Sequence, residues 1–345
     1  AMHFAFSEDQ TLLRDTVRDV LAKECAPEVV RRVWNGASDL RAPVWSTLAE
    51  NGFVGMAASE EAGGMGMDEV DLALVLEEAG YAGLPGPVAE TSLAGLRLLE
   101  TLGAGTPHAE WVGKVCAGDA TLALCFEGQQ LALHAPLADL LLIARGDALY
   151  AVPRAEAGLG EQTAVDRATT IATLDYTPSD KHLVARGPAA TAAIQLAYER
   201  AALGNACIMV GLSRRMLDLA VAYAKDREQF GKPIGAQQAV QHHLANAAGR
   251  IAFAQPVVYR AAWALANRDR HGDESRREAE LAVSTAKIYA EEAGRVVAKI
   301  ALQVHGAIGY TIECDLHFFM KRVWTLAPFY GTAADHRARI GAHIL

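Results

Sequence analysis

The sequence lacks the features that mark several common classes of protein. No apolar run approaches the length of a membrane span, and the start shows no signal-peptide pattern, so we expect a cytoplasmic protein without membrane contact. Only 21% of the 345 residues are charged, the net charge is -9, and no segment is rich in lysine or arginine. This charge distribution argues against a nucleic-acid partner.

Metal-ligand and redox spacings are also missing. The five cysteines are scattered without a C-x-x-C pair, and no set of His, Asp and Glu has the spacing of a metal site. We therefore expect no metal, and we expect the cysteines to be buried free thiols in a reducing compartment. They are Cys25, Cys116, Cys125, Cys207 and Cys314.

Hydrophobic residues, in contrast, are abundant. They make up 51% of the chain, which suggests that much of the surface is buried in an oligomer, and the length suggests two or three domains. Residues 1–117 carry helical periodicity and predict an N-terminal helical domain. Within it, Ser7 to Gln10 has capping-box form, and Asp68 is a suitable N-cap for a helix that should end at Gly80.

Residues 118–187 differ in hydrophobic period and predict a small middle β-domain. Short apolar runs at 121–126, 140–144 and 149–152 predict strands, and Arg145-Gly146-Asp147 predicts the turn of a hairpin. This region contains no tryptophan.

Residues 188–345 predict a C-terminal four-helix bundle. Pro188 to Asp226 forms one very long helical pattern, rich in alanine and apolar on several faces, as expected at the centre of a bundle. A second pattern runs from about Gln237 to Ala266, and Ser275 to Glu278 has the capping-box form of a third helix. The predicted fold class is therefore α+β.

The segment from Arg227 to Gln238 joins the first two of these long helices and has a composition unlike either. Gly231, Pro233 and Gly235 stop the first helix and turn the chain. The same segment places a cation and several amide groups around one aromatic ring, a mixture that suits an anionic, planar ligand.

This segment resembles the acyl-CoA dehydrogenase family, whose members carry an R-x-x-F-G-x-P-I-x-x-x-Q corner between two helices of the bundle. Gln303 to Glu313 is similar to the family's Q-x-x-G-G-x-G-Y/F-x-x-E segment, and Gly331-Thr332 is similar to its E-G-T turn. The resemblance implies the acyl-CoA dehydrogenase fold, FAD as cofactor, an acyl-CoA thioester as substrate and electron-transfer flavoprotein as electron acceptor.

The resemblance also implies a set of dinucleotide-binding residues. Arg227 would bind the pyrophosphate of a flavin that reaches across from a neighbouring subunit. Phe230 and Ile234 could equally be core residues, and Thr332 could be a helix N-cap. The full set is Arg227, Gln229, Phe230, Ile234, Gln237, Gln238, Gln303, Gly306, Ala307 and Thr332.

The parts that the family uses for chemistry are missing. The position of the usual catalytic Glu holds Tyr330, and a phenol with a pKa of about 10 is a poor base at neutral pH. Glu199 is the alternative candidate for the base, with a structural salt bridge as its competing interpretation. The arginine that some relatives direct at the CoA phosphate falls on Ala202, and the loop and tryptophan strand that hold the flavin ring are absent.

Three functions are compatible with this pattern. The first is the non-catalytic, shorter subunit of a heterotetrameric acyl-CoA dehydrogenase, completing the FAD site of a paralogous catalytic subunit. The second is a self-sufficient homo-oligomeric dehydrogenase with Glu199 as displaced base. The third is a scaffold that kept the fold and lost the flavin.

Overall fold

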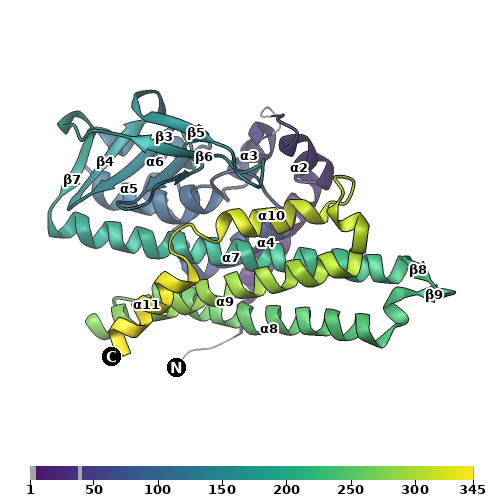
Figure 1. Cartoon of the computed structure of the whole chain (residues 1–345). Coiled ribbons are helices and arrows are strands. Elements are labelled where there is room, and N and C mark those ends of the chain that lie inside the picture. Colours follow the sequence, from purple (N-terminus) through teal and green to yellow (C-terminus); the bar gives the residue numbers. More distant parts are fainter. Residues whose placement is uncertain (1–4, 38–40, 345) are drawn as a thin grey trace.

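The computed structural model describes residues 5–37 and 41–344. Three long helices lie side by side as a rod, the strands cover one end of it, and the N-terminal helices pack beside them (Figure 1). A small hairpin projects from the other end. The predicted α+β class is confirmed, with a helical N-terminal region, small sheets and long C-terminal helices, whereas the boundaries at 117/118 and 187/188 stay predictions.

The N-terminal region is helical. Ser7 forms the expected capping box, because its hydroxyl accepts from the Gln10 amide at 3.1 Å while its own amide donates to the Gln10 side chain at 3.1 Å. The α-helices are α1 (Glu8–Glu24), α2 (Pro27–Trp34), α3 (Arg41–Glu50), α4 (Glu69–Ala82), α5 (Leu96–Gly103) and α6 (Glu110–Cys116).

One predicted helix end is wrong. Asp68 does cap α4, but the helix continues through Gly80 to Ala82 and ends at Gly83, which has a φ of 68°. Gly80 serves a different purpose, since a Cβ there would lie 2.2 Å from the carbonyl oxygen of Ile208. The glycine lets α4 cross the long central helix closely.

The middle region contains two small sheets. One has the strand order β1-β3-β4-β7 and the other the order β2-β6-β5. The predicted hairpin turn is confirmed, because Arg145 pairs with Ala148 and Gly146 has a φ of 57°. The strands are β1 (Leu122–Cys125), β2 (Ala132–Leu133), β3 (Leu140–Arg145), β4 (Ala148–Pro153), β5 (Gly158–Gln162), β6 (Ile171–Asp175) and β7 (Leu183–Arg186).

The C-terminal helices agree with the predicted bundle apart from one start. The predicted capping box at Ser275 is wrong, because Gly272, with a φ of 66°, is the N-cap and α9 begins three residues earlier than predicted. Ser275 instead accepts from the His271 amide at 3.2 Å. The helices are α7 (Pro188–Asp226), α8 (Gln238–Ala266), α9 (Asp273–His305), α10 (Leu316–Leu326) and α11 (Ala333–Ile344).

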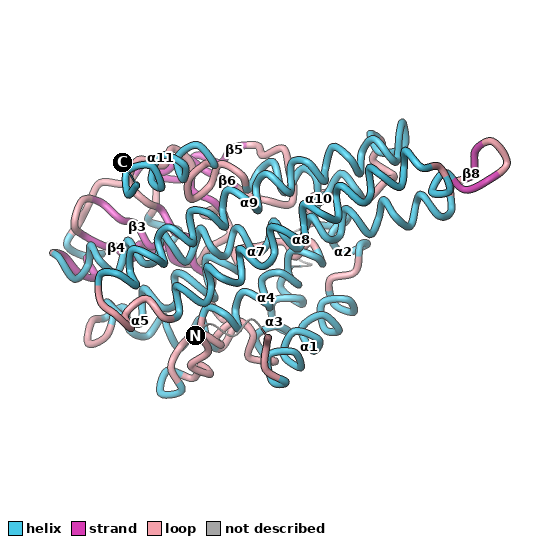
Figure 2. Tube along the Cα trace, turned by 90° about the horizontal axis from the view of Figure 1, so that it is seen from below, coloured by secondary structure: helices cyan, strands magenta, loops and turns pink. Residues whose placement is uncertain are grey.

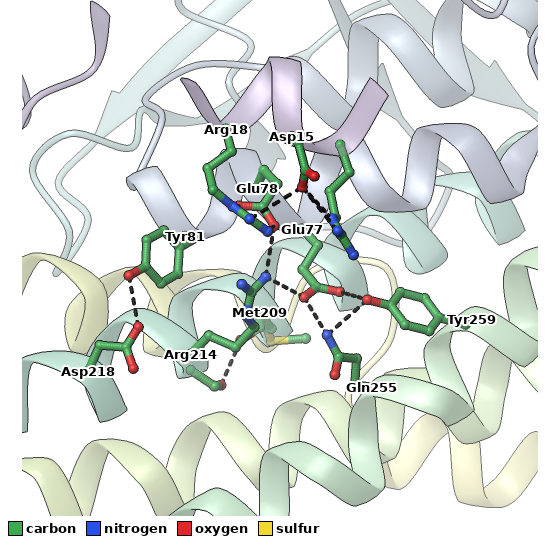
Figure 3. A network of polar contacts seen from close by, with 12 residues as sticks. Asp15, Arg18, Glu77, Glu78, Tyr81, Met209, Arg214, Asp218, Gln255 and Tyr259 are labelled. Atoms are coloured by element: carbon green, nitrogen blue, oxygen red, sulfur yellow. Dashed lines mark hydrogen bonds and ion pairs between the residues drawn. The ribbon is translucent and has the colours of Figure 1, made fainter. Parts of the chain in front are cut away.

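A buried ion network fastens the N-terminal helices to the bundle (Figure 3). Glu77 and Glu78 of α4 are 2% and 1% exposed, and the Arg214 guanidinium of α7 lies 2.6 Å and 2.9 Å from their carboxylates. Arg18 of α1 donates to Glu78 at 2.9 Å, and Tyr259 of α8 donates to Glu77 at 2.6 Å. One cluster therefore joins four helices.

Removing the shared cation of this network should destabilise the protein strongly. Arg214→Ala leaves two carboxylates buried without their common partner, which costs about 3–5 kcal/mol of unfolding free energy. The matched control is Arg276→Ala, whose ion pair with Asp269 has side chains 52% and 68% exposed and should matter by less than about 1 kcal/mol. Urea denaturation measures both, and equal losses would contradict the role of the network.

Candidate functional site

The predicted cofactor corner forms a hairpin that projects beyond the ends of α7 and α8 (Figure 2). Strands β8 (Glu228–Gln229) and β9 (Lys232–Pro233) are joined by Phe230 and Gly231, whose φ values of 55° and 77° are typical of a type I′ turn. Phe230 is 91% exposed. It is therefore not a core residue of this chain.

Arg227 lies at the base of the hairpin, directly after α7. Its backbone is fixed, because its amide donates to the Tyr223 carbonyl and its carbonyl accepts from the Ile234 amide, both at 2.8 Å. Its side chain is exposed, and no side-chain partner for it occurs among residues 5–37 and 41–344. The guanidinium is thus available to an anion from outside the chain.

The remaining amides of the corner lie close to the hairpin. Gln229 is exposed and donates to the Glu228 carbonyl at 2.7 Å, while Gln238 is an exposed first residue of α8. Ile234 and Gln237 are half-buried where the chain turns into that helix.

The second predicted segment lies at the same end of the bundle. The ring of Tyr223, one turn before Arg227, stacks on His305 at the end of α9, with centroids 4.7 Å apart and an angle of 20° between the ring planes. Gln303, Gly306 and Ala307 around this histidine are exposed. Gly306 has a φ of 63° and no neighbour within 4 Å of an added Cβ, so its backbone is open to a ligand.

Thr332 lies far from the corner. It caps α11, since its amide and hydroxyl donate to the Asp335 carboxylate at 2.9 Å and 2.7 Å. Gly331, which precedes Thr332, and Asp335, its hydrogen-bond partner, both line a cleft of 570 Å³ between the sheets and the start of α7. The predicted residue set is therefore divided between two places.

The cleft is lined mainly by aromatic, amide and glycine residues. The cleft and the corner contact the same helix near its two ends, because Tyr198 lines the cleft and Asp226 ends α7. At 1.5 Å per residue these positions are about 40 Å apart, a distance longer than an extended dinucleotide. Cleft-lining residues are Phe126, Glu127, Gly128, Gln129, Gln130, Leu131, Ala144, Gly146, Ile194, Gln195, Tyr198, Pro328, Phe329, Gly331 and Asp335.

Tyr330 stands beside the cleft but turns away from it. It is 1% exposed, has a φ of 56°, and donates its phenolic hydrogen to the Glu90 carboxylate at 2.9 Å. Burial raises the Tyr330 pKa further above its usual value, with the neighbouring Glu90 charge as the second cause. A phenol in this state is not a proton acceptor.

Glu90 is the buried partner that sequence reasoning missed. Burial raises the pKa of its carboxyl to about 7, and the Tyr330 hydrogen bond opposes that rise in part. Glu90 opens a π-helical turn, Glu90–Gly95, and is 4% exposed. The sequence does contain one sign of this role: Glu90 is a single carboxylate within a mainly apolar stretch. A carboxylate buried there costs free energy unless it has a hydrogen-bond partner.

Further buried polar groups hold the loop that contains Tyr330. Lys287 of α9 donates to the carbonyls of Ala327 and Gly331 at 2.8 Å and 3.0 Å, and burial lowers its pKa to about 8. His336 donates through Nε2 to the Tyr330 carbonyl at 2.9 Å, and burial lowers its pKa to about 4. Backbone carbonyls are thus bound on both sides of the phenol.

Glu199 has the surroundings of a structural carboxylate. It is 3% exposed, accepts from Gln195 at 3.0 Å, and lies 3.4 Å from the Arg268 guanidinium beyond the end of α8. Burial raises its pKa. Its neighbours Gln195 and Tyr198 line the cleft, whereas Glu199 itself is paired away from it.

Two family domains match the chain. The acyl-CoA dehydrogenase N-terminal domain matches residues 7–119, and the acyl-CoA dehydrogenase C-terminal domain matches residues 188–345. The chain is also 31% identical to acyl-CoA dehydrogenase IpdE2 of Mycolicibacterium smegmatis, over 98% of this chain and 99% of that protein. This chain is a member of the acyl-CoA dehydrogenase family. The predicted family and oxidoreductase class are confirmed.

Other relatives are similar to this chain over almost its whole length. Acyl-CoA dehydrogenase FadE34 of Mycobacterium tuberculosis is 31% identical over 97% of this chain, which matches 47% of that protein. The ChsE4-ChsE5 complex of the same organism contains a chain with a TM-score of 0.85 and 22% identity, with 99% of both chains covered. That likeness shows the shared fold.

FAD, the predicted cofactor, is confirmed as the cofactor of this family. The corner of this chain fits the phosphate end of that molecule, because an exposed guanidinium and an open glycine backbone are the donors that a pyrophosphate needs. Among the described residues no group of three or more His, Cys, Asp and Glu could hold a metal ion, and no helix is long and apolar enough to cross a membrane. All five cysteines are free thiols, but the prediction that all are buried is wrong for Cys116 and Cys314, which are half-buried.

Replacing Glu90 by Gln should alter the pH dependence of stability. The folded pKa of about 7 lies above the ordinary value of 4.5, so the unfolded chain loses this proton first as the pH rises. Glu90 thus contributes stability that is fully present below pH 4.5 and lost as the pH rises through 7, at up to about 1.4 kcal/mol per pH unit. In urea denaturation, the free energy of unfolding of Glu90→Gln should therefore rise relative to that of the wild type as the pH increases from about 5 to about 8. Exposed Glu60→Gln is the control, and parallel curves for Glu90→Gln and the wild type would contradict the burial of this carboxyl.

Proposed function

We propose that this chain is the non-catalytic subunit of a cytoplasmic, heteromeric acyl-CoA dehydrogenase, in which it completes the FAD site of a paralogous catalytic subunit. The observation that carries the proposal is the separation of the two half-sites along α7 by about 40 Å. No dinucleotide can span from this chain's cleft to its own corner. The corner therefore serves a flavin whose ring belongs to another chain, and we take that chain to be a different, catalytic one because Tyr330 occupies the position of the base here.

In this assembly the corner residues bind the flavin tail. Arg227 donates its paired N–H groups to the pyrophosphate, and exposed Phe230 offers its ring to the adenine. Gln303 and the backbone at Gly306 add hydrogen bonds from the end of α9. Gln229, Ile234, Gln237, Gln238 and Ala307 surround these contacts, while Thr332 acts as the cap of α11.

The catalytic roles fall to the partner. FAD supplies the hydride acceptor for α,β-desaturation of the acyl-CoA thioester, and the base that removes the α-proton is a carboxylate on the catalytic subunit. In this chain the corresponding phenol is buried against Glu90, and Glu199 is held by Arg268. Electron-transfer flavoprotein is the proposed acceptor of the electrons.

Two of the similar structures support a heteromeric, steroid-related assembly. One is the ChsE4-ChsE5 complex, and another is a Tcur3481-Tcur3483 steroid acyl-CoA dehydrogenase variant with a TM-score of 0.80 and 24% identity. We therefore propose a bulky acyl-CoA thioester as the substrate of the whole enzyme.

Co-expression with a longer paralogue tests the proposal through its flavin stoichiometry. We expect a complex with one FAD for each pair of unlike chains, while this chain alone is colourless. Arg227→Ala should lower the FAD affinity of the complex at least tenfold, since a hydrogen bond to a charged group is worth about 1.5–3 kcal/mol.

The matched control for that variant is Lys232→Ala, an exposed cation on the neighbouring strand of the same hairpin. It should leave FAD affinity near the wild-type value, and size-exclusion chromatography should show both variants still assembled. One FAD per chain in a pure homo-oligomer that oxidises acyl-CoA would reject the proposal.

A further inference from the structure

Two buried side chains beside the cleft, Tyr330 and Glu90, are not used by the proposed cofactor site. Phe329 and Gly331 line the cleft, while Tyr330 between them turns its ring into the interior. There its hydroxyl donates to Glu90 at 2.9 Å. The hydrogen-bonded phenol and carboxyl thus connect the cleft-lining loop to the π-helical turn Glu90–Gly95.

Both partners have unusual backbone conformations. Tyr330 has a φ of 56°, which is unfavourable for a bulky residue, and Glu90 begins a π-helical turn. Strained backbone of this kind persists only where surrounding contacts hold it, and it concentrates at functional sites. Here the contacts are the Lys287 and His336 hydrogen bonds to the same loop.

The Tyr330 ring is also held from the cleft side. Phe126, a cleft-lining residue, meets it edge to face with centroids 6.0 Å apart, and Phe126 in turn meets Tyr198 at 5.3 Å. The loop is packed closely against α7, because a Cβ on Gly331 would lie 2.7 Å from the Tyr198 hydroxyl. One layer of aromatic rings therefore separates the cleft from Glu90.

We propose that the Glu90–Tyr330 pair is a plug that closes this chain's own cleft to the acyl part of a thioester. The ring excludes the acyl group by volume, and the carboxyl fixes the ring in the excluding position. The charged residues among the cleft lining are Glu127 and Asp335, which also disfavour the phosphates of CoA. This inference concerns the cleft of this chain and does not depend on the flavin role of the corner.

The first experiment removes the phenol and returns it as a free molecule. Tyr330→Gly suits the left-handed backbone and leaves a space of the shape of p-cresol beside Glu90. Calorimetry should show that the variant binds p-cresol at least about tenfold more tightly than toluene, because the hydroxyl regains its carboxyl partner. The wild type should bind neither in this space. Equal affinity of the variant for p-cresol and toluene would overturn the Glu90 contact.

The second experiment measures the plug with octanoyl-CoA on the full chain. Tyr330→Gly should bind octanoyl-CoA at least about tenfold more tightly than the wild type, with p-cresol as a competitor, since the deleted ring is a large apolar volume. Tyr330→Phe keeps the ring but loses its hydrogen bond to Glu90, so this variant should bind octanoyl-CoA more weakly than Tyr330→Gly does. Octanoyl-CoA binding to the wild type as tight as to Tyr330→Gly would overturn the plug.

A third variant covers the case in which Tyr330→Gly does not fold. Glu90→Ala removes the carboxyl behind the ring and should also raise octanoyl-CoA affinity, whereas unchanged affinity in this variant would overturn the proposal. The outcome is separable from that of the flavin experiment. A failed plug leaves the FAD count of the complex unchanged, and a failed flavin role leaves these binding differences in place.

Discussion

The buried network around Glu77, Glu78 and Arg214 is the constraint on which the rest of the molecule depends. It takes carboxylates from α4, a guanidinium from α7 and hydrogen-bond donors from α1 and α8, and it fixes these helices to one another. A charge buried in this way is stable only with its partners in place. The N-terminal helices therefore cannot shift along α7 without breaking it, and the cleft and corner keep fixed positions on a common helix.

That common helix explains why the chain carries parts of two sites. α7 has 39 residues, so it places the cleft near its beginning and Arg227 directly after its end. A ligand of dinucleotide size meets only one of these places on a given chain. The corner presents the exposed side chains of Arg227 and Phe230, whereas Tyr330 beside the cleft is buried. The two places are therefore suited to different ligands.

Periodicity and turn chemistry predicted most of the fold. The long helix from Pro188, the Arg145–Ala148 hairpin and the Ser7 capping box all depend on residues close in sequence, which a reader of the sequence can see. The end of α4 was predicted wrongly because Gly80 is a close-crossing residue beside Ile208, a contact between distant segments. Tertiary packing there overrode the local signal.

The candidate sites were predictable to a different degree. The corner motif located Arg227 and its neighbours, because all lie within one turn of the chain. The pairing of Tyr330 with Glu90, 240 residues apart, and of Glu199 with Arg268 could not be predicted, since only the folded chain brings these groups together. Glu90 and Lys287 share one feature that is visible in the sequence: each is a single charged residue among apolar residues of a helix, and both are buried in the structure.

The exposed hairpin has a consequence for how the protein is produced in the cell. Phe230 at its tip and Tyr310 and Ile312 beyond α9 are 91%, 77% and 72% exposed on the isolated chain. Uncovered rings and aliphatic groups of this kind favour non-specific association and attract chaperones and proteases. Surplus copies are thus a liability, which gives selection a reason to translate the two polypeptides of the proposed enzyme in matched amounts, for instance from one message.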